Sequence, residues 1–402
     1  MALTRPDRSN DVLLREISDL RFCCAICADD PGLARRALRS REGPIDWLAL
    51  IEVARSHRLQ MLLYRAATKH FPDVAGSATL AALRELYADN VARCQVMTTA
   101  LVRLLRKLTA EQIPALGFKG PVFGAQFYGD VALRTYSDLD LLVRKDDIAK
   151  VTDVMRDLGY RTGGMALGWE LSFVHDTAES VDVHWSIADK IHQFPLTTDE
   201  LWARRTSTEL DGMSAPTLCA EDALLTICFN GLTEDWQRCD RIADVAQVMR
   251  SGDPIDWPNF LDRCRQHGCE RLVLVGLHLA RELFLVELPQ VVERRLRSHR
   301  KAIARAGYVM DDFMRFVVTS TDRRGGMDYW RHVVRMRERQ WERIPYYQAL
   351  AYSLFQPKDD DAPWQRKSRE VLYRILRLPL LLIKHGLRLL GHANLRHPDN
   401  QP

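Results

Sequence analysis

Apolar residues recur at helical spacing through the first hundred residues of the chain. The stretches "DWLALIEVARSHRLQMLLYRAA" and "LAALRELYADNVARCQVMTTALVRLLRKL" repeat apolar side chains every three or four positions and contain no proline. This spacing gathers apolar side chains on one face of a helix, which a hydrophobic core then covers. The pattern predicts helices over 11–110, and we take 1–110 as an N-terminal helical region.

The pattern changes at residue 113, where shorter apolar runs begin. "IPALGFKG" ends in glycine and predicts a strand that leads into a turn. "PVFGAQFYG" starts with Pro121 at a suitable first helical position and ends at Gly129, which predicts a short helix. After the loop "DVALRTYS", the run "DLDLLV" is apolar on both faces toward its end, as expected of a strand at the centre of a sheet.

A helix and two further strands are predicted after this central strand. "DDIAKVTDVMRDLGY" has acidic residues at its start, an apolar stripe at helical spacing and Gly159 at its end. "WELSFVHD" and "ESVDVHW" are strand candidates, and the second alternates Val181 and Val183 with Asp182 and His184. These alternating residues predict a strand with one apolar face and one polar face.

Helical periodicity returns from about residue 198, in "CAEDALLTICFNGL", "RIADVAQVMR", "WPNFLDRCRQ" and "ERLVLVGLHLARELF". The sequence therefore predicts an α+β protein with a small mixed α/β core over 111–190, set between helical regions. We expect a helical region over 191–320 and a helical, basic region over 321–402. No repeat of fixed period is present.

Composition and charge limit the classes of function. The chain has 402 residues, 47% hydrophobic and 27% charged, as is typical of a soluble globular protein. Its formal net charge of +4 is too small to indicate a nucleic-acid-binding surface, so nucleic acid is not expected as a partner. The N-terminal residues lack the apolar segment of a secretory signal, which favours a cytoplasmic location.

The nine cysteines do not form a recognisable zinc-binding pattern. Cys24 and Cys27 have CxxC spacing but no second pair, and Cys264, His267 and Cys269 form only a loose group. The irregular spacing favours reduced, mostly buried thiols.

Three carboxylates are candidates for a metal site. Asp138 and Asp140 are two residues apart on one predicted strand, so their side chains leave the same face. Asp182 would join them if its strand is a neighbour. Three clustered carboxylates repel one another unless a cation is present, and such oxygen ligands suit Mg²⁺ or Mn²⁺, as two ions in phosphoryl-transfer sites. Alternatively, the pair flanks a solvated turn and Asp182 is an exposed strand residue.

The residues around the pair suggest phosphate binding. In "GFKGP", Lys119 and Gly120 form a strand–turn–helix junction that offers a cation and backbone N–H groups to a phosphate. Arg134 is in reach of a triphosphate, and Ser137 either contacts phosphate or caps the turn. His184 either orients an acceptor or acts as a base, or it is a strand histidine bonded to a carboxylate. The ordinary alternatives are that Lys119 is a surface lysine and that Arg134 is a solvated loop arginine.

The order of these motifs resembles a known family. "KG", an aromatic-rich helix that ends in "YG", then "R.YSDLDLLV", a helix that ends in "LGY", and "VDVHW" are similar to nucleotidyltransferases of the DNA polymerase β superfamily. The chain resembles most closely a large, poorly characterised bacterial branch of nucleotidyltransferase family proteins. "ARSHRLQMLLYRA", "CAEDALLTICFNG" and "DWQRCDRIADVAQVM" add weaker similarity, over about 45–390.

The resemblance implies a polymerase β-like core that transfers an NMP group from an NTP to a hydroxyl acceptor, a small molecule, sugar or peptide, and releases pyrophosphate. By motif, Asp138 and Asp140 match the family's acidic pair and Asp182 its third acid. The resemblance implies that these three residues bind Mg²⁺ or Mn²⁺. Two departures stand out. The superfamily usually has Gly-Ser at the phosphate turn where this chain has Lys119-Gly120, and Asn230 stands where a histidine is expected.

Two other classes of function are compatible with the sequence. A non-catalytic nucleotide-binding or regulatory protein of the same fold would be favoured by loss of one acid, but all three are present. The basic, apolar segment 371–390 resembles an interfacial helix, as in a membrane-associated factor of polysaccharide or modified-peptide biosynthesis. The alternative for this segment is a helix that docks on the protein's own core.

Overall fold

The computed structural model describes residues 10–28, 30–41, 43–163, 168–176, 180–316 and 327–355. The chain divides into two compact units, Met1–Glu338 and Arg339–Pro402. In the second unit the described residues form a 3₁₀ turn, η4 (Trp341–Arg343), and helix α16 (Ile344–Phe355). Segment 371–390, which resembles an interfacial helix in sequence with docking on the protein's own core as the alternative, lies outside the described residues. Within the described residues, no helix is both long enough and apolar enough to cross a membrane.

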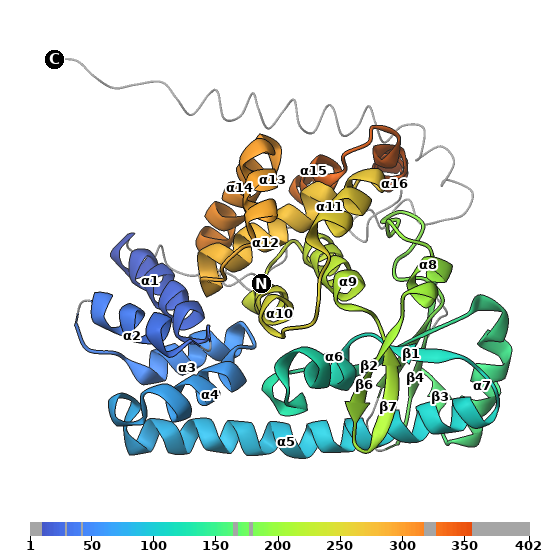
Figure 1. Ribbon diagram of the computed structural model, residues 1–402, viewed down its shortest axis with the longest axis horizontal. Helices are drawn as coiled ribbons and strands as arrows, with labels where there is room; N and C mark the ends of the chain where they lie inside the picture. Colours follow the sequence, from blue (N-terminus) through green and yellow to red (C-terminus); the bar gives the residue numbers. More distant parts are fainter. Residues whose placement is uncertain are drawn as a thin grey trace, which may run out of the picture. The chain divides into compact units, whose positions relative to one another are not determined.

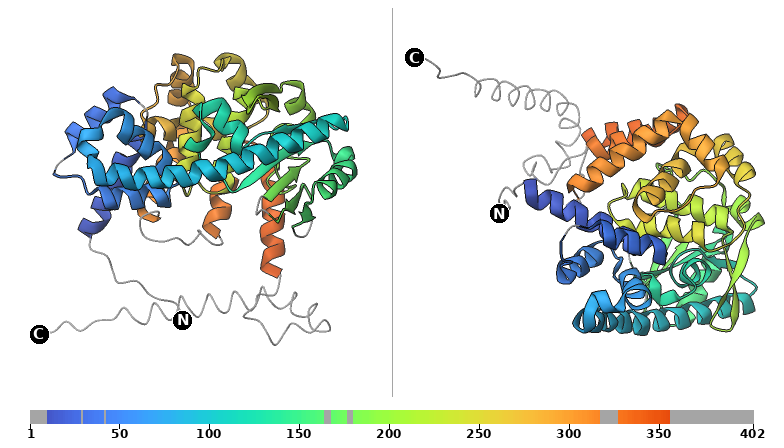
Figure 2. Two further views of the ribbon diagram at one scale, coloured as in Figure 1. Left: turned by 90° about the horizontal axis from the view of Figure 1, so that it is seen from below. Right: turned by 60° about the vertical axis from the view of Figure 1, so that its left-hand side comes forward.

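Helices form the N-terminal part of the first unit, as the apolar periodicity predicts. They are α1 (Asn10–Ile26), α2 (Pro31–Ser40), α3 (Trp47–Ser56), α4 (Gln60–His70) and α5 (Pro72–Ala110). Helix α5 is the long helix that runs beneath the sheet in Figure 1 and crosses in front of it in Figure 2. Its inner face carries Leu101, Leu104, Leu105 and Leu108, all buried.

A five-stranded mixed sheet follows, in the order β1-β2-β5-β4-β3. The strands are β1 (Ala115–Gly117), β2 (Asp138–Val143), β3 (Arg161–Thr162), β4 (Glu170–Val174) and β5 (Ser180–His184). Strands β2 and β5 are parallel, and the other pairs are antiparallel. The prediction that "DLDLLV" forms a central strand is confirmed, because β2 lies between β1 and β5.

The hydrophobic core lies on one face of this sheet. Leu139 and Leu141 of β2 and Val181 and Val183 of β5 are buried in one cluster with α5 and with α7 (Ile148–Asp157). Burying one such side chain stabilises the fold by about 1.5–3 kcal/mol. A slip of one residue would turn these side chains toward the polar face, so the core fixes the register of β2 and β5.

The connection between β1 and β2 has the predicted short helix, in a more irregular form. Helix α6 (Gly120–Phe123) continues into a π-helical turn, η1 (Gly124–Tyr128), and ends at Gly129 in the left-handed conformation. A 3₁₀ turn, η2 (Val131–Leu133), then begins at Asp130, whose side chain accepts a hydrogen bond from the backbone N–H of Ala132. A further 3₁₀ turn, η3 (Lys145–Asp147), precedes α7.

A β-hairpin in residues 206–217 corrects the purely helical interpretation of the chain after residue 198. Helix α8 (Thr198–Ala203) is followed by β6 (Thr206–Leu210) and β7 (Met213–Thr217), which pair in antiparallel fashion. Asp211 and Gly212 form the turn between them, with φ of 48° and 70°. Such Asp-Gly turns match the twist of two antiparallel strands.

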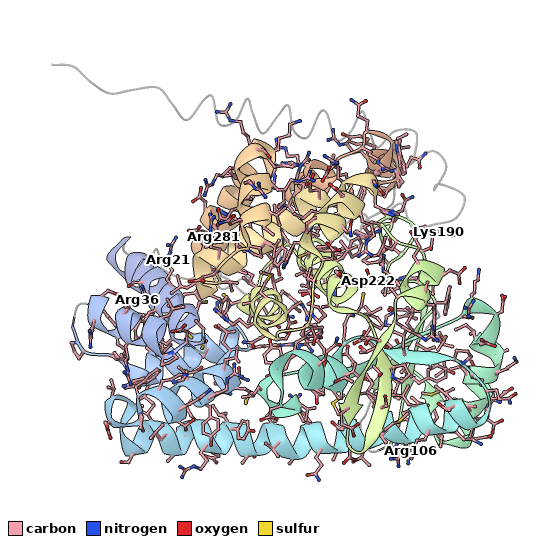
Figure 3. All side chains as sticks on the ribbon, in the orientation of Figure 1. Arg21, Arg36, Arg106, Lys190, Asp222 and Arg281 are labelled. Atoms are coloured by element: carbon pink, nitrogen blue, oxygen red, sulfur yellow. The ribbon has the colours of Figure 1, made fainter. Side chains whose placement is uncertain are left out.

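The remaining helices confirm the periodicity that the sequence shows after this hairpin. They are α9 (Ala220–Thr233), α10 (Cys239–Arg250), α11 (Trp257–Gln266), α12 (Glu270–Phe284), α13 (Gln290–Ser298), α14 (Arg300–Phe316) and α15 (Met327–Met336). Helix α12 packs on α9, α10 and α14. Asp222 of α9, labelled in Figure 3, is fully buried and forms ion pairs with Arg204 and Arg263.

All nine cysteines are free thiols, and eight of them are buried. Cys24 Sγ of α1 lies 3.5 Å from Cys239 Sγ of α10. The prediction of unpaired, mostly buried cysteines is confirmed.

Candidate active site

The polar face of the sheet brings the three predicted carboxylates together. Asp140 of β2 is aligned with Asp182 of β5, and Asp138 is aligned with Ser180. Because β2 and β5 are adjacent, with neighbouring strands about 4.8 Å apart, aligned side chains project side by side from the same face. This is the face opposite the core, so the alternation that buries leucine and valine also presents the three aspartates.

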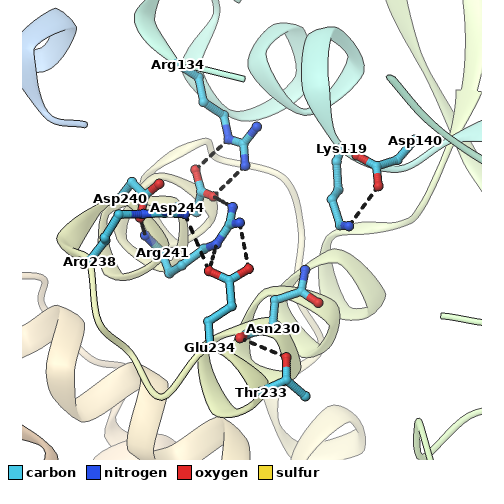
Figure 4. A network of polar contacts seen from close by, with 10 residues as sticks. All are labelled: Lys119, Arg134, Asp140, Asn230, Thr233, Glu234, Arg238, Asp240, Arg241 and Asp244. Carbon is cyan, nitrogen blue, oxygen red and sulfur yellow. Dashed lines mark hydrogen bonds and ion pairs between the residues drawn. The ribbon is translucent and has the colours of Figure 1, made fainter. Parts of the chain in front are cut away.

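Asp140 is the most tightly held of the three. Its Oδ1 accepts a hydrogen bond from Lys119 Nζ at 2.8 Å, an ion pair that Figure 4 shows. The same oxygen lies 3.1 Å from His184 Nε2. The carboxylate is buried, and two neighbours from separate elements share one of its oxygens.

The electrostatic environment separates the two aspartates of β2. Burial alone would raise the pKa of Asp140, but the Lys119 ammonium and the hydrogen bond with His184 outweigh it and hold this pKa well below its ordinary value. The pKa of Asp138 is raised, first by burial and then by the negative charge of Asp140, while Lys119 opposes the shift. Asp140 therefore stays ionised. The ionised form of Asp138, in contrast, is disfavoured by burial and by the negative charge of Asp140.

The turn that delivers Lys119 depends on Gly120. This glycine has φ of 57°, a conformation that residues with a Cβ rarely adopt. A Cβ added there would lie 3.3 Å from the backbone oxygen of Asp138. The close approach seats the turn against the start of β2 and places the Lys119 side chain over Asp140.

Glu170 is a residue of this face that sequence reasoning missed. It is aligned with His184 across β4 and β5, and its Oε2 lies 3.3 Å from His184 Nδ1. Burial raises the pKa of Glu170, and the neighbouring His184 opposes that shift. The alternation in "WELSFVHD" is the signal that would have found it, since it puts Glu170 and Ser172 on one face.

Aromatic rings complete the surroundings of His184. The rings of Phe118 and Trp169 each have a centroid 5.2 Å from that of the imidazole. With Asp140 and Glu170 on its two nitrogens, the imidazole has a fixed orientation. Of the two alternatives for His184, the structure shows the contact with carboxylates, and a role toward an acceptor stays a prediction.

Arg134 points to a helix rather than to the carboxylate face. Its guanidinium donates two hydrogen bonds to Asp244 of α10, Nε to Oδ1 and Nη2 to Oδ2, both 2.9 Å long. Tyr128 donates a third hydrogen bond to Asp244, at 2.7 Å. Burial would lower the pKa of Arg134, but Asp244 outweighs burial and raises it. Arg134 thus anchors α10 to the segment before β2, and its predicted phosphate contact stays a prediction.

Ser137 is exposed at the start of β2. Its backbone oxygen accepts a hydrogen bond from Ser180 Oγ at 3.3 Å, which joins the beginnings of β2 and β5. Phosphate binding by its hydroxyl also stays a prediction. Asn230, in the position where a histidine was expected, lies on α9 beside Glu234 in Figure 4.

The donor set suits a hard divalent cation in kind. Asp138, Asp140 and Asp182 supply oxygen atoms, which are the ligands that Mg²⁺ and Mn²⁺ prefer. A cation would also stabilise the ionised form of Asp138, whose pKa is raised by burial and then by the negative charge of Asp140. Across the residues described, no group of three or more His, Cys, Asp or Glu side chains is already arranged around a metal position.

Comparison with known proteins gives one informative match. A family model described as an uncharacterised nucleotidyltransferase matches residues 43–285, which contain the whole sheet and all the candidate residues. No curated protein matches the chain.

Two solved structures of the antibiotic-resistance factor ANT(2'')-Ia are similar to part of the chain. A solution structure has 15% identity and a TM-score of 0.30, and the match covers 53% of this chain and 98% of that one. A crystal structure in complex with adenylyl-2''-tobramycin has 15% identity and a TM-score of 0.29, covering 51% and 99%. At these TM-scores neither structure supports an argument about this chain.

Proposed function

The chain belongs to the uncharacterised nucleotidyltransferase family, and from this premise we propose that it transfers an NMP group from an NTP to a hydroxyl group of an acceptor. The observation that carries the proposal is the alignment of Asp140 with Asp182 on adjacent parallel strands, with Asp138 on the same face. The predicted pair and third acid of the family thereby occupy one surface.

Asp138, Asp140 and Asp182 would hold two Mg²⁺ or Mn²⁺ ions. Ions bound there would supply positive charge to the phosphate oxygens as negative charge develops on them. Asp140 is suited to this role because its low pKa keeps it ionised at neutral pH. Asp138 and Asp182 are less buried than Asp140 and remain accessible on the same face.

Lys119 and the turn at Gly120 would hold the nucleotide's phosphates. The Lys119 ammonium is partly exposed and already lies on this face through its contact with Asp140. A phosphate oxygen can accept a hydrogen bond from the same ammonium, which has three donors. Gly120 is buried against the backbone of Asp138, so its turn would act by fixing the position of Lys119. Ser137 and Arg134 remain candidates for further phosphate contacts at the start of β2.

The acceptor hydroxyl would approach on the β5 side of the face. Its oxygen forms a bond to the α-phosphorus while the bond from that phosphorus to the β-phosphate oxygen breaks, and pyrophosphate leaves. The hydroxyl proton passes to the Asp182 carboxylate. His184, buried with Asp140 and Glu170 at its two ring nitrogens, would act indirectly by holding the Asp140 carboxylate in place beside Asp182.

The acceptor is a small molecule, a sugar or a peptide in this proposal, with the helical region over 191–320 forming its pocket. Nucleic acid is not favoured, given the small net charge. A cytoplasmic location goes with the proposal because that is where NTPs are supplied.

Release of labelled pyrophosphate tests the proposed function. The protein is incubated with each NTP, Mg²⁺ and a small-molecule extract that supplies acceptors. We expect release from one or more NTPs, and a loss of at least about 100-fold when Asp138→Ala and Asp140→Ala are combined. Asp153→Ala on the exposed face of α7 is the matched control and should retain full activity. Equal rates for the double variant and the wild type would overturn the assignment.

A further inference from the structure

Three arginines gather where the N-terminal helices meet α10. Arg58 lies in the turn between α3 and α4, Arg238 directly precedes α10, and Arg241 lies in its first turn. The backbone N–H of Cys239 donates to His57 Nδ1 at 3.4 Å, which fixes the turn of Arg58 against the start of α10. Figure 4 shows Arg238 and Arg241 in the same network as Arg134.

Two of these arginines form ion pairs with carboxylates, and the third forms none with the residues that the structure describes. Arg241 donates to both oxygens of Glu234, at 3.1 Å and 2.8 Å. Arg238 lies 3.5 Å from Glu234 and 3.4 Å from Asp240. No carboxylate among the described residues forms an ion pair with Arg58.

The guanidinium of Arg58 is therefore poorly compensated. Burial lowers its pKa, and the positive charge of Arg238 lowers it further, although Asp240 acts in the opposite direction. His57 adds no charge at neutral pH, because burial lowers its pKa to about 4. With Arg134, four guanidinium groups face three carboxylates, Glu234, Asp240 and Asp244, and Arg58 is the one that forms no ion pair with a described carboxylate.

The backbone of Arg58 adopts the left-handed conformation that ends α3. Its φ is 55°, and the N–H groups of Arg58 and Leu59 donate to Arg55 and Ala54, which is the usual way a helix ends on a left-handed residue. Glycine is the favoured residue at such a position.

We propose that Arg58, Arg238 and Arg241 bind a phosphate group carried by the acceptor of the proposed nucleotidyl transfer. The inference rests on that proposed function. A phosphate monoester fits three guanidinium groups better than a carboxylate does, because it offers three acceptor oxygens and a charge between about −1 and −2. Guanidinium groups bind the terminal oxygens of phosphate with paired hydrogen bonds.

The location connects this arginine cluster to the carboxylate face. Arg241 Nη1 lies 3.9 Å from Asp244 Oδ2, and Asp244 is the partner of Arg134. Arg134 is followed four residues later by Asp138, the first residue of β2. An acceptor anchored at the cluster by its phosphate would extend its hydroxyl toward the sheet.

Calorimetric titration with inorganic phosphate tests the proposal directly. We expect wild-type protein to bind phosphate, and Arg58→Gly to bind it about tenfold more weakly or worse, because one charged hydrogen-bonding group is lost. Its melting temperature should equal or exceed that of the wild type, because glycine relieves the left-handed backbone. Gln112→Gly is the matched control: Gln112 holds the same left-handed position after α5, with φ of 57°, and should leave phosphate affinity unchanged.

Two results would overturn the proposal. One is equal phosphate affinity in the wild type and Arg58→Gly. The other is displacement of phosphate from the wild type by a non-hydrolysable NTP analogue, which would assign the phosphate to the nucleotide's own site. The analogue should bind Arg58→Gly as tightly as the wild type. Failure of the analogue to bind the wild type at all would count against nucleotidyl transfer. The phosphate titration tests the arginine cluster independently of that result.

Discussion

At the scale of single residues, Asp140 decides how the site behaves. It is buried, which disfavours its charge, and it is ionised because Lys119 and His184 stabilise that charge. Its folded-state pKa lies below the unfolded value, so ionised Asp140 stabilises the fold above about pH 4. This contribution is lost as the pH falls through the folded-state pKa.

Lys119→Met tests this balance. The variant leaves a buried carboxylate without its ammonium partner, so we expect it to lose about 3 kcal/mol of unfolding free energy at pH 7. Burial then raises the pKa of Asp140 in the variant above its ordinary value of about 4, so its carboxylate takes up a proton at a higher pH than in the wild type. The difference in unfolding free energy between the two proteins should therefore start to narrow above about pH 4 and narrow further as the pH falls below it. Urea unfolding at a series of pH values measures both effects.

Lys150→Met is the control for this prediction, because Lys150 forms an exposed ion pair with Asp147 on the surface. It should change the unfolding free energy by less than about 0.5 kcal/mol at every pH. A Lys119→Met variant that behaves like this control would show that Asp140 does not depend on Lys119.

At the scale of elements, most of the site follows from alternation along β2 and β5. Leucine and valine alternate with aspartate there, so the sequence predicts both the buried face and the polar face. Glu170 was missed because no face was assigned to its strand. The hairpin at 206–217 was missed because threonine, serine and glutamate in β6 give no clear apolar alternation, which leaves Asp211-Gly212 as its only local signal.

The ion pair between Arg134 and Asp244 is the element-scale contact that no sequence pattern predicts. The two residues are 110 positions apart, and their pairing depends on how α10 packs on η1. Nothing near Arg134 in the sequence distinguishes a phosphate ligand from a structural anchor. A buried charged residue such as Arg134 can be recognised as a structural anchor only when the structure shows its partner.

Breaking this pair should be costly, and removing both partners less so. We expect Asp244→Leu to reduce the unfolding free energy by about 3–5 kcal/mol, because it leaves the buried Arg134 charge uncompensated. The double variant with Arg134→Met should be more stable than Asp244→Leu alone. Denaturant unfolding of the two single variants and the double variant gives the coupling between them. A double variant whose loss equals the sum of the single losses would contradict the account of the pair as one unit.

At the scale of the whole molecule, the fold class and the family were predicted from the order of motifs, and both are confirmed. The fold uses one face of a small sheet for packing and presents the three aspartates on the other, which we propose as the active site. The carboxylates come from β2 and β5. The partners of Asp140 come from the turn at Lys119 and from β5, Glu170 of β4 contacts His184, and the neighbouring polar network comes from α9 and α10 (Figure 4). The sequence predicts the carboxylates because their spacing along each strand is local. Their partners and the polar network of α9 and α10 depend on long-range packing.

The most direct test of the central claim is metal-dependent NTP binding, which needs no knowledge of the acceptor. Calorimetry with a non-hydrolysable NTP analogue is carried out with and without Mn²⁺, on the wild type, Asp182→Asn and the control Asp153→Asn. The account predicts that Mn²⁺ strengthens binding in the wild type and the control, and that Asp182→Asn loses at least about tenfold of this gain. A gain that is the same in all three proteins would contradict the assignment of the β2–β5 carboxylate face as the active site.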